Sequence, residues 1–431
     1  MKPKISKHFK NRNPSAIREA QIIFSNRVDK NEVDIINLAI GNISLPMHPS
    51  MIHKMKELGN TTFSDGIIKY TPTIGTDNAR DAFLNILSSL DIETHNIHCN
   101  ITDGGSAAME LMLMGVCGPS SHQPIMLLDP TYTNYVDFTK RLSIPIITNE
   151  RKLKKNGSFE KLDLGKIREL ISTEKPAGLV VIPYDNPSGQ YIERKILIEL
   201  SKICVESNIW IISDEAYRTL YYGDSSNISS IWNISESEVK GITGRRISIE
   251  SSSKVWNACG LRIGALMTDN YEFHEKSTSE YTANLSANAI GQEIFGVLKD
   301  ETKEDLVLWY RSQQSYYKKI MYKLRRDLEN KIPGLIISKP QAAIYFIIDF
   351  KNIVDEKFDS VLFTKYCAEK GKVEIKQCFY SILLAPMKSF YQNAKLGRTQ
   401  MRLAVVEPPQ KMNLTAEVLK SLFFAYNKSI G

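Results

Sequence analysis

The 431-residue sequence predicts an α/β protein in which a mostly parallel sheet carries helices on both faces and is followed by a smaller α+β unit. Two observations support this fold class. Short apolar runs alternate with amphipathic stretches from about residue 97 to residue 213, which is typical of parallel strands joined by helices. After residue 300, a long charged and apolar stretch reaches residue 328. We expect this stretch to be one helix that connects the two units.

The predicted elements follow from hydrophobic periodicity along the chain. Strands are expected at residues 97–102, 124–128, 144–148, 178–183 and 209–213, and helices at 106–116, 134–142 and 192–207. Pro333-Gly334 ends the connecting helix, and a strand at 343–350 opens the smaller unit. On the connecting helix, a shared face contains Tyr310, Tyr316, Tyr317 and Met321. We interpret this face as core packing.

Composition and charge argue against several classes of protein. With 42% hydrophobic and 24% charged residues, the chain is typical of globular proteins. The net charge of +7 suits an anionic small ligand. Because the basic clusters are short and no zinc-finger or basic-zipper pattern accompanies them, we expect no nucleic-acid partner. No apolar run approaches the ~18 residues of a membrane span, and residues 1–12 lack the apolar core of a signal peptide. We expect no membrane association.

The cysteines predict a reducing environment. Six cysteines are scattered along the chain without a CxxC pair, and the chain is too large to depend on disulfides for its core. We therefore expect a cytoplasmic protein.

Four polar segments at the ends of predicted strands contain the candidate chemistry, because ligands bind at the carboxyl ends of parallel strands. In the first, residues 102–106 (TDGGS), the glycines and the Ser106 hydroxyl could hold a phosphate at a helix start. A tight turn is the alternative. In the second, residues 185–189 (DNPSG), a turn alone explains the composition.

The third and fourth segments contain charged groups. Asp214 ends the apolar strand at 209–213, and its burial implies a cationic partner, although a helix N-cap is the alternative. Tyr217 follows three residues later and could reach the same ligand. In the fourth segment, Lys254 follows three serines and precedes Arg262 by eight residues. Hydroxyls and a guanidinium suit a phosphate, and the lysine could form a Schiff base with an aldehyde. An exposed loop is the alternative there.

The order and spacing of these motifs, from about residue 36 to residue 406, resemble the class I/II aminotransferases, a family of fold type I pyridoxal 5′-phosphate (PLP) enzymes. The shared motifs are a phosphate loop, PxY, NPxG, DxxY, SxSK and GxRxG. The resemblance implies a large PLP-binding domain with a mostly parallel central sheet and a smaller α+β domain. We place them at residues 46–325 and 326–431, with an N-terminal arm and part of the small domain at 1–45.

The resemblance also implies roles for single residues. Lys254 would hold PLP as an internal aldimine and shuttle protons, and Asp214 would keep the pyridine nitrogen protonated. Asn186 and Tyr217 would donate to the ring O3′, and Tyr132 would stack on the ring. Lys254, Asp214 and Tyr217 are thus the expected catalytic residues. The expected phosphate-binding residues are Gly105, Ser106, Ser251, Ser253 and Arg262.

Further matches concern the amino-acid substrate. Arg402 resembles the arginine whose planar fork pairs with the α-carboxylate, and Gly41 resembles the segment that closes over it. Asn186 is also expected to contact the substrate. Tyr70 resembles a tyrosine donated to the phosphate site of a neighbouring subunit, which implies a homodimer with shared active sites. Ala342 stands where glycine is usual, so we expect a narrower pocket there.

The implied function is transfer of the α-amino group of an amino acid to a 2-oxo acid by a ping-pong mechanism. Another PLP-dependent reaction at Cα or Cβ (β-lyase, racemase, decarboxylase or oxidase) stays open, as does a non-catalytic regulator that binds PLP or an amino acid. Fewer than about 40 residues precede the core, too few for the winged helix-turn-helix unit that such regulators usually carry, which argues against the regulator. The stretch 281–293, which matches the region of a second arginine in dicarboxylate-specific relatives, has no Arg or Lys. This argues against aspartate or glutamate as the preferred donor, unless another cation reaches in.

The remaining polar residues are expected to be structural. His48 and His53 are predicted to be surface or helix-cap residues, and no spacing of His, Cys and Asp suggests a metal site. The basic runs at 151–155 and 318–326 are predicted to be solvated faces of helices or loops.

Overall fold

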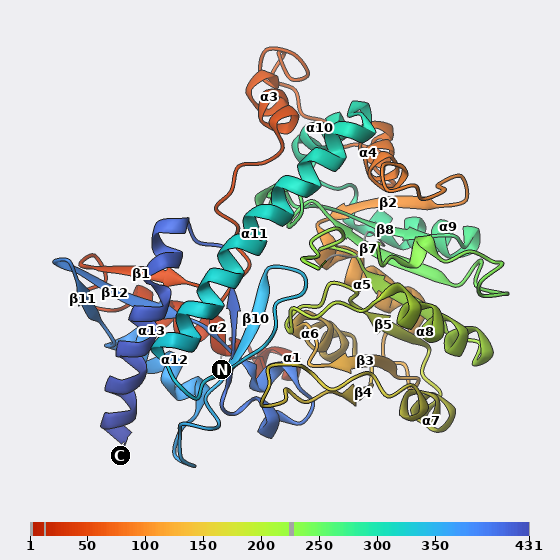
Figure 1. Cartoon of the computed structure of the whole chain (residues 1–431). Helices are drawn as coiled ribbons and strands as arrows, with labels where there is room; N and C mark the ends of the chain where they lie inside the picture. The colour runs from red at the N-terminus through yellow and green to blue at the C-terminus, as the bar shows by residue number, and fades with distance from the viewer. Residues whose placement is uncertain (1–2, 13, 224–227, 431) are drawn as a thin grey trace.

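The computed structural model describes residues 3–12, 14–223 and 228–430, which form three sheets flanked by helices (Figure 1). The largest sheet has seven strands in the order β2-β8-β7-β6-β5-β3-β4. They are β2 (His98–Asp103), β3 (Ile125–Asp129), β4 (Ile146–Glu150), β5 (Gly178–Val181), β6 (Trp210–Asp214), β7 (Arg246–Ser251) and β8 (Ile263–Thr268). Because β8 alone runs against its two neighbours, the sheet is mostly parallel, as predicted.

Helices cover both faces of this sheet because its central strands are apolar on both sides. All residues of β3 and β5 are buried, which is the pattern of a doubly covered parallel sheet. One core cluster joins the sheet to α5 (Gly105–Val116), α6 (Thr133–Leu142) and α9 (Tyr271–Tyr281). A second cluster joins the other face to α7 (Leu164–Glu174) and α8 (Arg194–Glu206).

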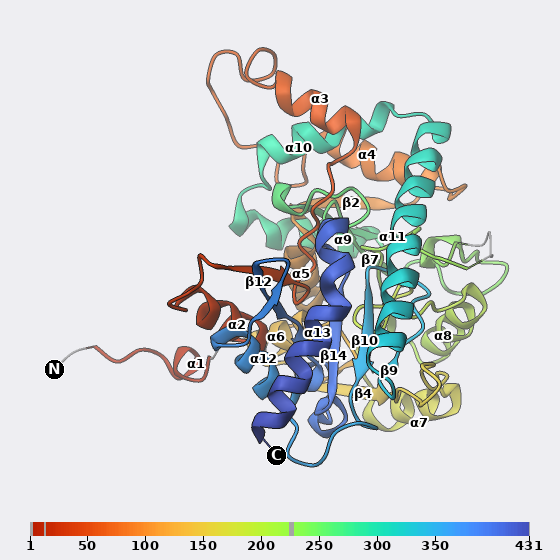
Figure 2. The same cartoon turned by 60° about the vertical axis from the view of Figure 1, so that its left-hand side comes forward.

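The two smaller sheets are built mainly from the last third of the chain, and one of them also contains a strand from its beginning (Figure 2). One has the order β1-β12-β11, with β1 (Val33–Asn37), β12 (Cys378–Leu383) and β11 (Val373–Ile375). The other has the order β13-β14-β10-β9, with β13 (Ala385–Pro386), β14 (Gln400–Ala404), β10 (Tyr345–Asp349) and β9 (Ile336–Ile337). The flanking helices are α2 (Ala16–Ser25), α12 (Ser360–Glu369) and α13 (Pro409–Ile430), and the short α1 is Lys7–Lys10.

The predicted connecting helix is α11 (Lys303–Lys331), which runs from α10 (Ala289–Gly296) toward the smaller sheets (Figure 1). Near α10 lie α3 (Pro49–Glu57) and α4 (Asp77–Ser88). On α11, Tyr310, Tyr317 and Met321 are buried in the core and Tyr316 packs against it. The interpretation of this face as core packing is therefore confirmed.

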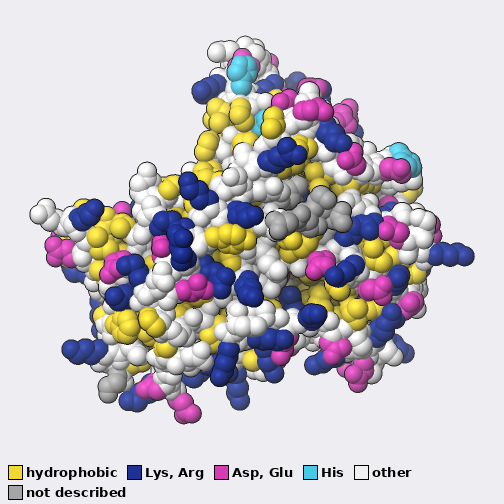
Figure 3. Space-filling model, in the orientation of Figure 1, with side chains coloured by type: hydrophobic (Ala, Val, Ile, Leu, Met, Phe, Trp, Pro, Cys, Tyr) yellow, Lys and Arg dark blue, Asp and Glu magenta, His cyan; other side chains and the backbone are white. Residues whose placement is uncertain are grey.

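The elements predicted between residues 97 and 213 are all present, with ends shifted by a few residues. The strand expected at 144–148 is β4 (Ile146–Glu150), and the helix expected at 192–207 is α8 (Arg194–Glu206). Among the helices that the structure describes, none is both long and apolar enough to cross a membrane. On the face shown in Figure 3, basic side chains are interspersed with acidic and uncharged ones.

Two predictions about polar residues hold only in part. The run 151–155 was expected to be a solvated face, and its three lysines are exposed, but Arg151 is buried and its Nη2 pairs with Asp185 Oδ2 at 3.1 Å. His48 was expected to be a surface or helix-cap residue. It is the N-cap residue of α3, but its side chain makes no cap hydrogen bond and is buried beside Trp256 and Trp309. His53 is exposed, as expected.

Buried charges at the ends of β6 and β7 form a closed network. Arg218 pairs with Glu215 at 2.9 Å and also with Glu250. Glu215 accepts hydrogen bonds from Ser213 Oγ and from the Ile231 amide. Because all three charged side chains are buried, removal of the single cation would leave two carboxylates without a counter-charge.

We predict that Arg218→Met destabilises the fold strongly. Loss of one partner from a buried ion pair costs about 3–5 kcal/mol, and the measurement is the free energy of unfolding in urea. The control is Arg168→Met, which removes an exposed pair with Glu206 and should cost less than about 1 kcal/mol. Equal losses in the two variants would contradict a role for the buried network.

Candidate active site

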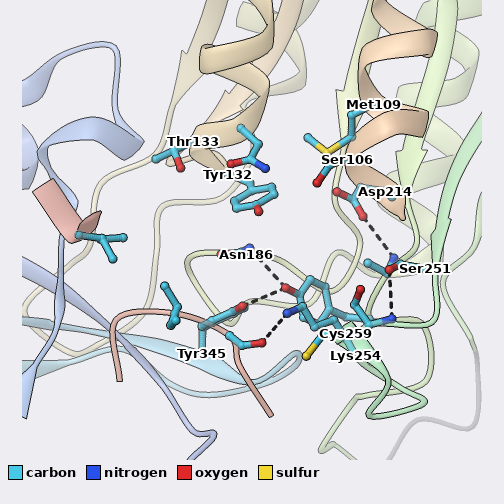
Figure 4. A pocket seen from close by; sticks show the side chains of 18 of the residues that line it. Ser106, Met109, Tyr132, Thr133, Asn186, Asp214, Ser251, Lys254, Cys259 and Tyr345 are labelled. Carbon is cyan, nitrogen blue, oxygen red and sulfur yellow. Dashed lines mark hydrogen bonds between the residues drawn. The ribbon is translucent and has the colours of Figure 1, made fainter. Parts of the chain in front are cut away.

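A cavity of about 400 Å³ lies where loops of the seven-stranded sheet meet β10, β14 and the segment before α3. All but one of the site residues expected from the sequence line this cavity, although they are spread over more than 360 positions of the chain. They are Gly41, Gly105, Ser106, Tyr132, Asn186, Asp214, Tyr217, Ser251, Ser253, Lys254, Arg262 and Arg402. Tyr132, Asp214 and Lys254 point into the cavity from different strands' loops (Figure 4).

Lys254 follows β7 and meets the backbone of the N-terminal segment. Its Nζ donates a hydrogen bond to Gly41 O at 2.6 Å. A Cβ atom at position 41 would lie 2.3 Å from Tyr345 Oη and 2.8 Å from Lys254 Nζ. A side chain at position 41 would therefore push the ends of the Tyr345 and Lys254 side chains aside, whereas glycine lets the backbone approach the lysine.

Asp214 is a buried carboxylate without a cation beside it. It ends β6, accepts hydrogen bonds from the Ala216 amide at 3.2 Å and from Tyr135 Oη at 3.1 Å, and has no lysine or arginine within ion-pair distance among the described residues. Burial raises the pKa of Asp214 to about 6, although these two hydrogen bonds lower it. A cationic group in the cavity would relieve this cost.

The start of α5 offers an anion site. Gly104 is the N-cap and supplies no side-chain acceptor, so the first amides of α5 at Gly105 and Ser106 are open toward the cavity. The Arg262 guanidinium donates to the carbonyls of Asp103 and Cys259 at 3.3 and 3.2 Å. Ser251 and Ser253 also line this part of the cavity. Together, the free amides of α5, the serine hydroxyls and the Arg262 guanidinium suit a phosphate.

Close packing fixes the approach of Arg262 to this loop. Gly104 has a φ of +77°, and a Cβ there would lie 2.5 Å from Arg262 Nη2. A side chain at position 104 would therefore be strained and would displace the guanidinium.

Arg402 is buried and only partly satisfied. Its Nη1 donates to Asn186 Oδ1 at 2.8 Å and its Nη2 to Ala39 O at 2.7 Å, whereas its Nε has no hydrogen-bond partner. The guanidinium carbon lies 4.3 Å from the centroid of the Tyr345 ring and 5.0 Å from that of Phe390. The two rings fix the orientation of the guanidinium plane. The Nε–H group, which has no partner in the protein, is therefore available to an anion.

The same contact orients the neighbouring amide. Because Arg402 binds Asn186 Oδ1, the Nδ2 group of Asn186 faces Tyr217 Oη, 3.4 Å away. Tyr217 Oη is in turn 3.0 Å from Tyr345 Oη. Burial raises the pKa of Tyr217 above its usual range, so this hydroxyl keeps its proton at neutral pH.

The loop that presents Asn186 is anchored by buried polar groups. Asp185 pairs with Arg151 and accepts a hydrogen bond from Ser188 Oγ. Gly189 follows with a φ of +67°, and a Cβ there would lie 2.1 Å from Tyr345 O. The composition of this segment, which a simple turn could also explain, thus serves to place Asn186.

One expected site residue, Tyr70, lies elsewhere, as does Ala342, which was expected to narrow the pocket. Tyr70 is 79% exposed and does not line the cavity of the single chain. Ala342 is buried, its amide donates to Gly189 O, and it is not among the residues that line the cavity. The expectation that Ala342 narrows this cavity is therefore wrong. Among the described residues, no group of His, Cys, Asp and Glu is arranged to hold a metal ion.

Sequence reasoning missed several residues of the site. Tyr135 could have been found, because it follows Tyr132 by three positions at a helix start and so lies on the same side of that helix. Tyr345 and Phe390 gave no signal, because they read as core residues in apolar segments. Arg151, which pairs with Asp185 beside Asn186, lies in a basic run that gave no sign of a buried residue. Arg18, which lines the cavity, lies outside every predicted motif.

Comparison with known proteins identifies the family. Residues 33–380 match the family "Aminotransferase class I and II". The chain is 26% identical over 352 residues to a probable aspartate/prephenate aminotransferase of Aquifex aeolicus, covering 80% of this chain and 83% of the relative. It is 25% identical over 428 residues to a probable aspartate aminotransferase of Methanocaldococcus jannaschii, covering 97% and 100%.

Solved structures share the fold. N-succinyldiaminopimelate aminotransferase of Mycobacterium tuberculosis superposes with a TM-score of 0.80 at 18% identity, covering 97% of this chain and 100% of that one. A putative kynurenine aminotransferase of Saccharomyces cerevisiae gives 0.80 at 18% identity, covering 98% and 99%. With the match over residues 33–380, these findings show that the chain belongs to the class I and II aminotransferase family and is a PLP-dependent aminotransferase of fold type I.

Proposed function

We propose that this aminotransferase moves the α-amino group of an amino acid to a 2-oxo acid in two half-reactions, and that Lys254 holds PLP covalently between them. The observation that carries the proposal is the convergence of Lys254, Asp214 and the partly unpaired Arg402 on one cavity. A nucleophilic amine, an uncompensated carboxylate and a planar cation are the groups that an aldehyde cofactor and an amino-acid carboxylate require.

The donors and acceptors of the cavity fit PLP in three places. The open amides of α5, with Ser251, Ser253 and Arg262, suit its phosphate. Asp214, which has no cation beside it in the protein, suits a protonated ring nitrogen. Asn186 Nδ2 and Tyr217 Oη are the expected donors to the ring hydroxyl oxygen, and Tyr132 is the expected stacking partner of the ring.

PLP, when bound, supplies an electron sink for the bonds at Cα of the amino acid. The protein's own groups then decide which proton moves. We propose that Lys254 Nζ would accept the proton from Cα of the substrate and donate one at the C4′ position when PLP is bound. Ionised Asp214 would pair with a protonated ring nitrogen, and Tyr217 and Asn186 would orient the ring.

Arg402 is proposed to bind the α-carboxylate of the substrate. Its free Nε and its fixed guanidinium plane suit a carboxylate that approaches from the cavity. The contacts to Asn186 and Ala39 keep the fork in place before substrate arrives, so little conformational entropy is lost on binding. Gly41 lines the same cavity and is expected to close over the α-carboxylate.

A homodimer is part of the proposal. Tyr70 is exposed, and Ile67 and Ile68 on the same segment are more than half exposed. Exposed apolar side chains on one segment favour an interface, and a second copy of the chain would bring Tyr70 to a phosphate site. All six cysteines are free thiols, and a reducing cytoplasm stays our prediction for the location.

The relatives do not by themselves select a donor. Their names include aspartate, aspartate/prephenate, aromatic amino acids and kynurenine as substrates. We therefore propose only that the two substrates are an amino acid and a 2-oxo acid.

The test is a half-reaction without any acceptor. The purified protein with bound PLP is mixed with single amino acids, and the 2-oxo acid and the cofactor spectrum are measured. We expect a stoichiometric 2-oxo acid and conversion of the cofactor to its amine form with at least one donor. Lys254→Ala should show no cofactor attached after borohydride reduction, whereas the exposed-lysine control Lys195→Ala should behave as the unmodified protein.

Other products would contradict the proposal that this enzyme is a transaminase. If ammonia, carbon dioxide or peroxide accumulated instead of a 2-oxo acid in stoichiometric amount, the enzyme would catalyse a different reaction at the same cofactor. Cofactor attachment in Lys254→Ala would show that another lysine holds PLP.

We predict that Arg402→Lys weakens substrate binding while PLP stays bound. A lysine lacks the second, coplanar donor, so the loss should reach about 10- to 100-fold in kcat/KM, the range expected for a charge-assisted hydrogen bond. The measurement is kcat and KM for the best donor, with bound PLP counted by absorbance. An unchanged KM would show that another group binds the α-carboxylate.

The raised pKa of Asp214 predicts a pH-dependent stability in the protein without PLP. Its pKa rises from 3.8 to about 6 because burial disfavours the charged form. The folded state therefore binds the proton more tightly than the unfolded state, and stability falls as pH rises from about 4 to 6. The side chain of Asp214→Asn cannot ionise. The free energy of unfolding of this variant, relative to that of the unmodified protein, should therefore rise across this pH range by about 3 kcal/mol.

The measurement is the unfolding midpoint of the two PLP-free proteins between pH 4 and pH 8. Parallel curves would contradict the prediction. With PLP and a donor, Asp214→Asn should lose on the order of 10²- to 10³-fold in kcat, since a group aimed at charge on the cofactor is removed.

A further inference from the structure

The hydroxyl group of Tyr345 has no part in the proposed function. Tyr345 is the first residue of β10, is buried and lines the cavity. Its neighbours in the sequence, Ile344 and residues 346–348, have side chains without polar atoms. A hydroxyl in such a buried strand is unfavourable unless it forms a hydrogen bond. The hydroxyl at position 345 therefore needs an explanation other than core packing.

Stacking on Arg402 explains the ring of Tyr345 but not its hydroxyl. The guanidinium carbon lies 4.3 Å from the centroid of the Tyr345 ring. Phe390, which has no hydroxyl, makes the same kind of contact with Arg402 at 5.0 Å. A cation is attracted to the face of an aromatic ring, and phenylalanine offers such a face as well as tyrosine does. A phenylalanine at position 345 would thus suffice to hold the guanidinium.

The Tyr345 hydroxyl contacts the hydroxyl of Tyr217. The two Oη atoms are 3.0 Å apart, and either could be the donor. Among the described residues, Tyr345 Oη has no other hydrogen-bond partner. Gly41 leaves the space that this hydroxyl occupies, since a Cβ at position 41 would lie 2.3 Å from Tyr345 Oη. The proton of Tyr345 is therefore free to be donated to Tyr217.

Tyr217 Oη is approached by a second donor, the side-chain amide of Asn186 (Figure 4). Asn186 Nδ2 lies 3.4 Å away, and Arg402 fixes the orientation of this amide by donating to its Oδ1. A phenol oxygen has two lone pairs and one proton. When Asn186 and Tyr345 both donate to Tyr217, both lone pairs are occupied. The single proton of Tyr217 is then left for a ligand in the cavity, which Tyr217 also lines.

From this arrangement we infer that Tyr345 is a positioning residue, whose hydroxyl donates to Tyr217 and thereby directs the Tyr217 proton to the ring hydroxyl oxygen of PLP. The inference rests on the proposed function, in which Tyr217 is a donor to that oxygen. Donation from Tyr345 also makes Tyr217 a stronger donor, because hydrogen bonds in a chain polarise one another. A stronger donor favours the anionic form of the ring oxygen. Tyr345 thus acts on the cofactor through Tyr217.

The first test is an absorbance titration of the protein with bound PLP. The ring oxygen belongs to the conjugated system of PLP, so the pH at which the bound cofactor changes its absorbance depends on how well charge on this oxygen is stabilised. Tyr345→Phe keeps the ring over Arg402 and removes only the hydroxyl. The control is Tyr317→Phe, which removes a buried hydroxyl that has no hydrogen-bond partner and does not line the cavity.

We expect the midpoint of the titration to rise by about 0.3 to 1 pH unit in Tyr345→Phe, the size expected for loss of a neutral hydrogen bond. It rises because a weaker donor stabilises the anionic oxygen less, so that the proton is lost at higher pH. The KM for the best amino donor should stay the same, because Arg402 keeps both aromatic neighbours. No shift in Tyr345→Phe, or an equal shift in Tyr317→Phe, would overturn the inference.

The second test asks whether the effect passes through Tyr217. Tyr217→Phe and the double variant Tyr217→Phe/Tyr345→Phe are titrated in the same way. The two should have the same midpoint, because without the Tyr217 hydroxyl the second change has nothing to act on. If Tyr345→Phe instead caused the same shift with and without the Tyr217 hydroxyl, Tyr345 would act on the cofactor directly or through packing, and the inference would fail.

Neither titration needs turnover, so the inference and the proposed function can fail separately. If the midpoints behaved as expected but no amino acid yielded a 2-oxo acid, transamination would be contradicted and the role of Tyr345 would stand. If a 2-oxo acid formed but the shifts of the two single variants were additive, transamination would stand and the role of Tyr345 would be contradicted.

Discussion

The buried Arg402 is the constraint on which the site depends. It lies on β14 of a smaller sheet, yet it binds Asn186 in a loop of the seven-stranded sheet and the carbonyl of Ala39 in the N-terminal segment. A buried guanidinium loses its hydration, and the hydrogen bonds of Nη1 and Nη2 offset part of that cost. Those partners fix how three distant parts of the chain meet, and the cavity forms between them.

Other buried charges hold the loops that surround this contact. Arg151 and Asp185 stabilise the turn that presents Asn186, and Arg218 joins the ends of β6 and β7 through two glutamates. Asp214 differs from these carboxylates because its partners are neutral hydrogen-bond donors. Asp129 and Asp349 are also buried without an ion pair among the described residues, but they do not line the cavity. Asp214 does line it, so its carboxylate lies where a cationic ligand atom can pair with it.

Much of the fold could be predicted because its signals are local. The strands of the large sheet are short apolar runs, and the turn residues at 102–106, 185–189 and 251–254 stand directly after strands. Since the carboxyl ends of parallel strands meet at one edge, motif residues far apart in the sequence could be expected to converge. Arg151 and Tyr345 could not be found in this way, because a basic run and an apolar strand have the same local pattern whether or not they border a site.

The sequence by itself determined the fold class, the order of the motifs and the kinds of chemical group available, because periodicity and turn composition act over a few residues. Only the tertiary structure decided which of those groups lack partners. The apolar run before Asp214 indicates that this carboxylate is buried, but only the folded chain shows that its partners are Tyr135 and a backbone amide and that it faces the cavity. Pairing and burial are properties of residues distant in sequence, so they become visible only when the chain is folded.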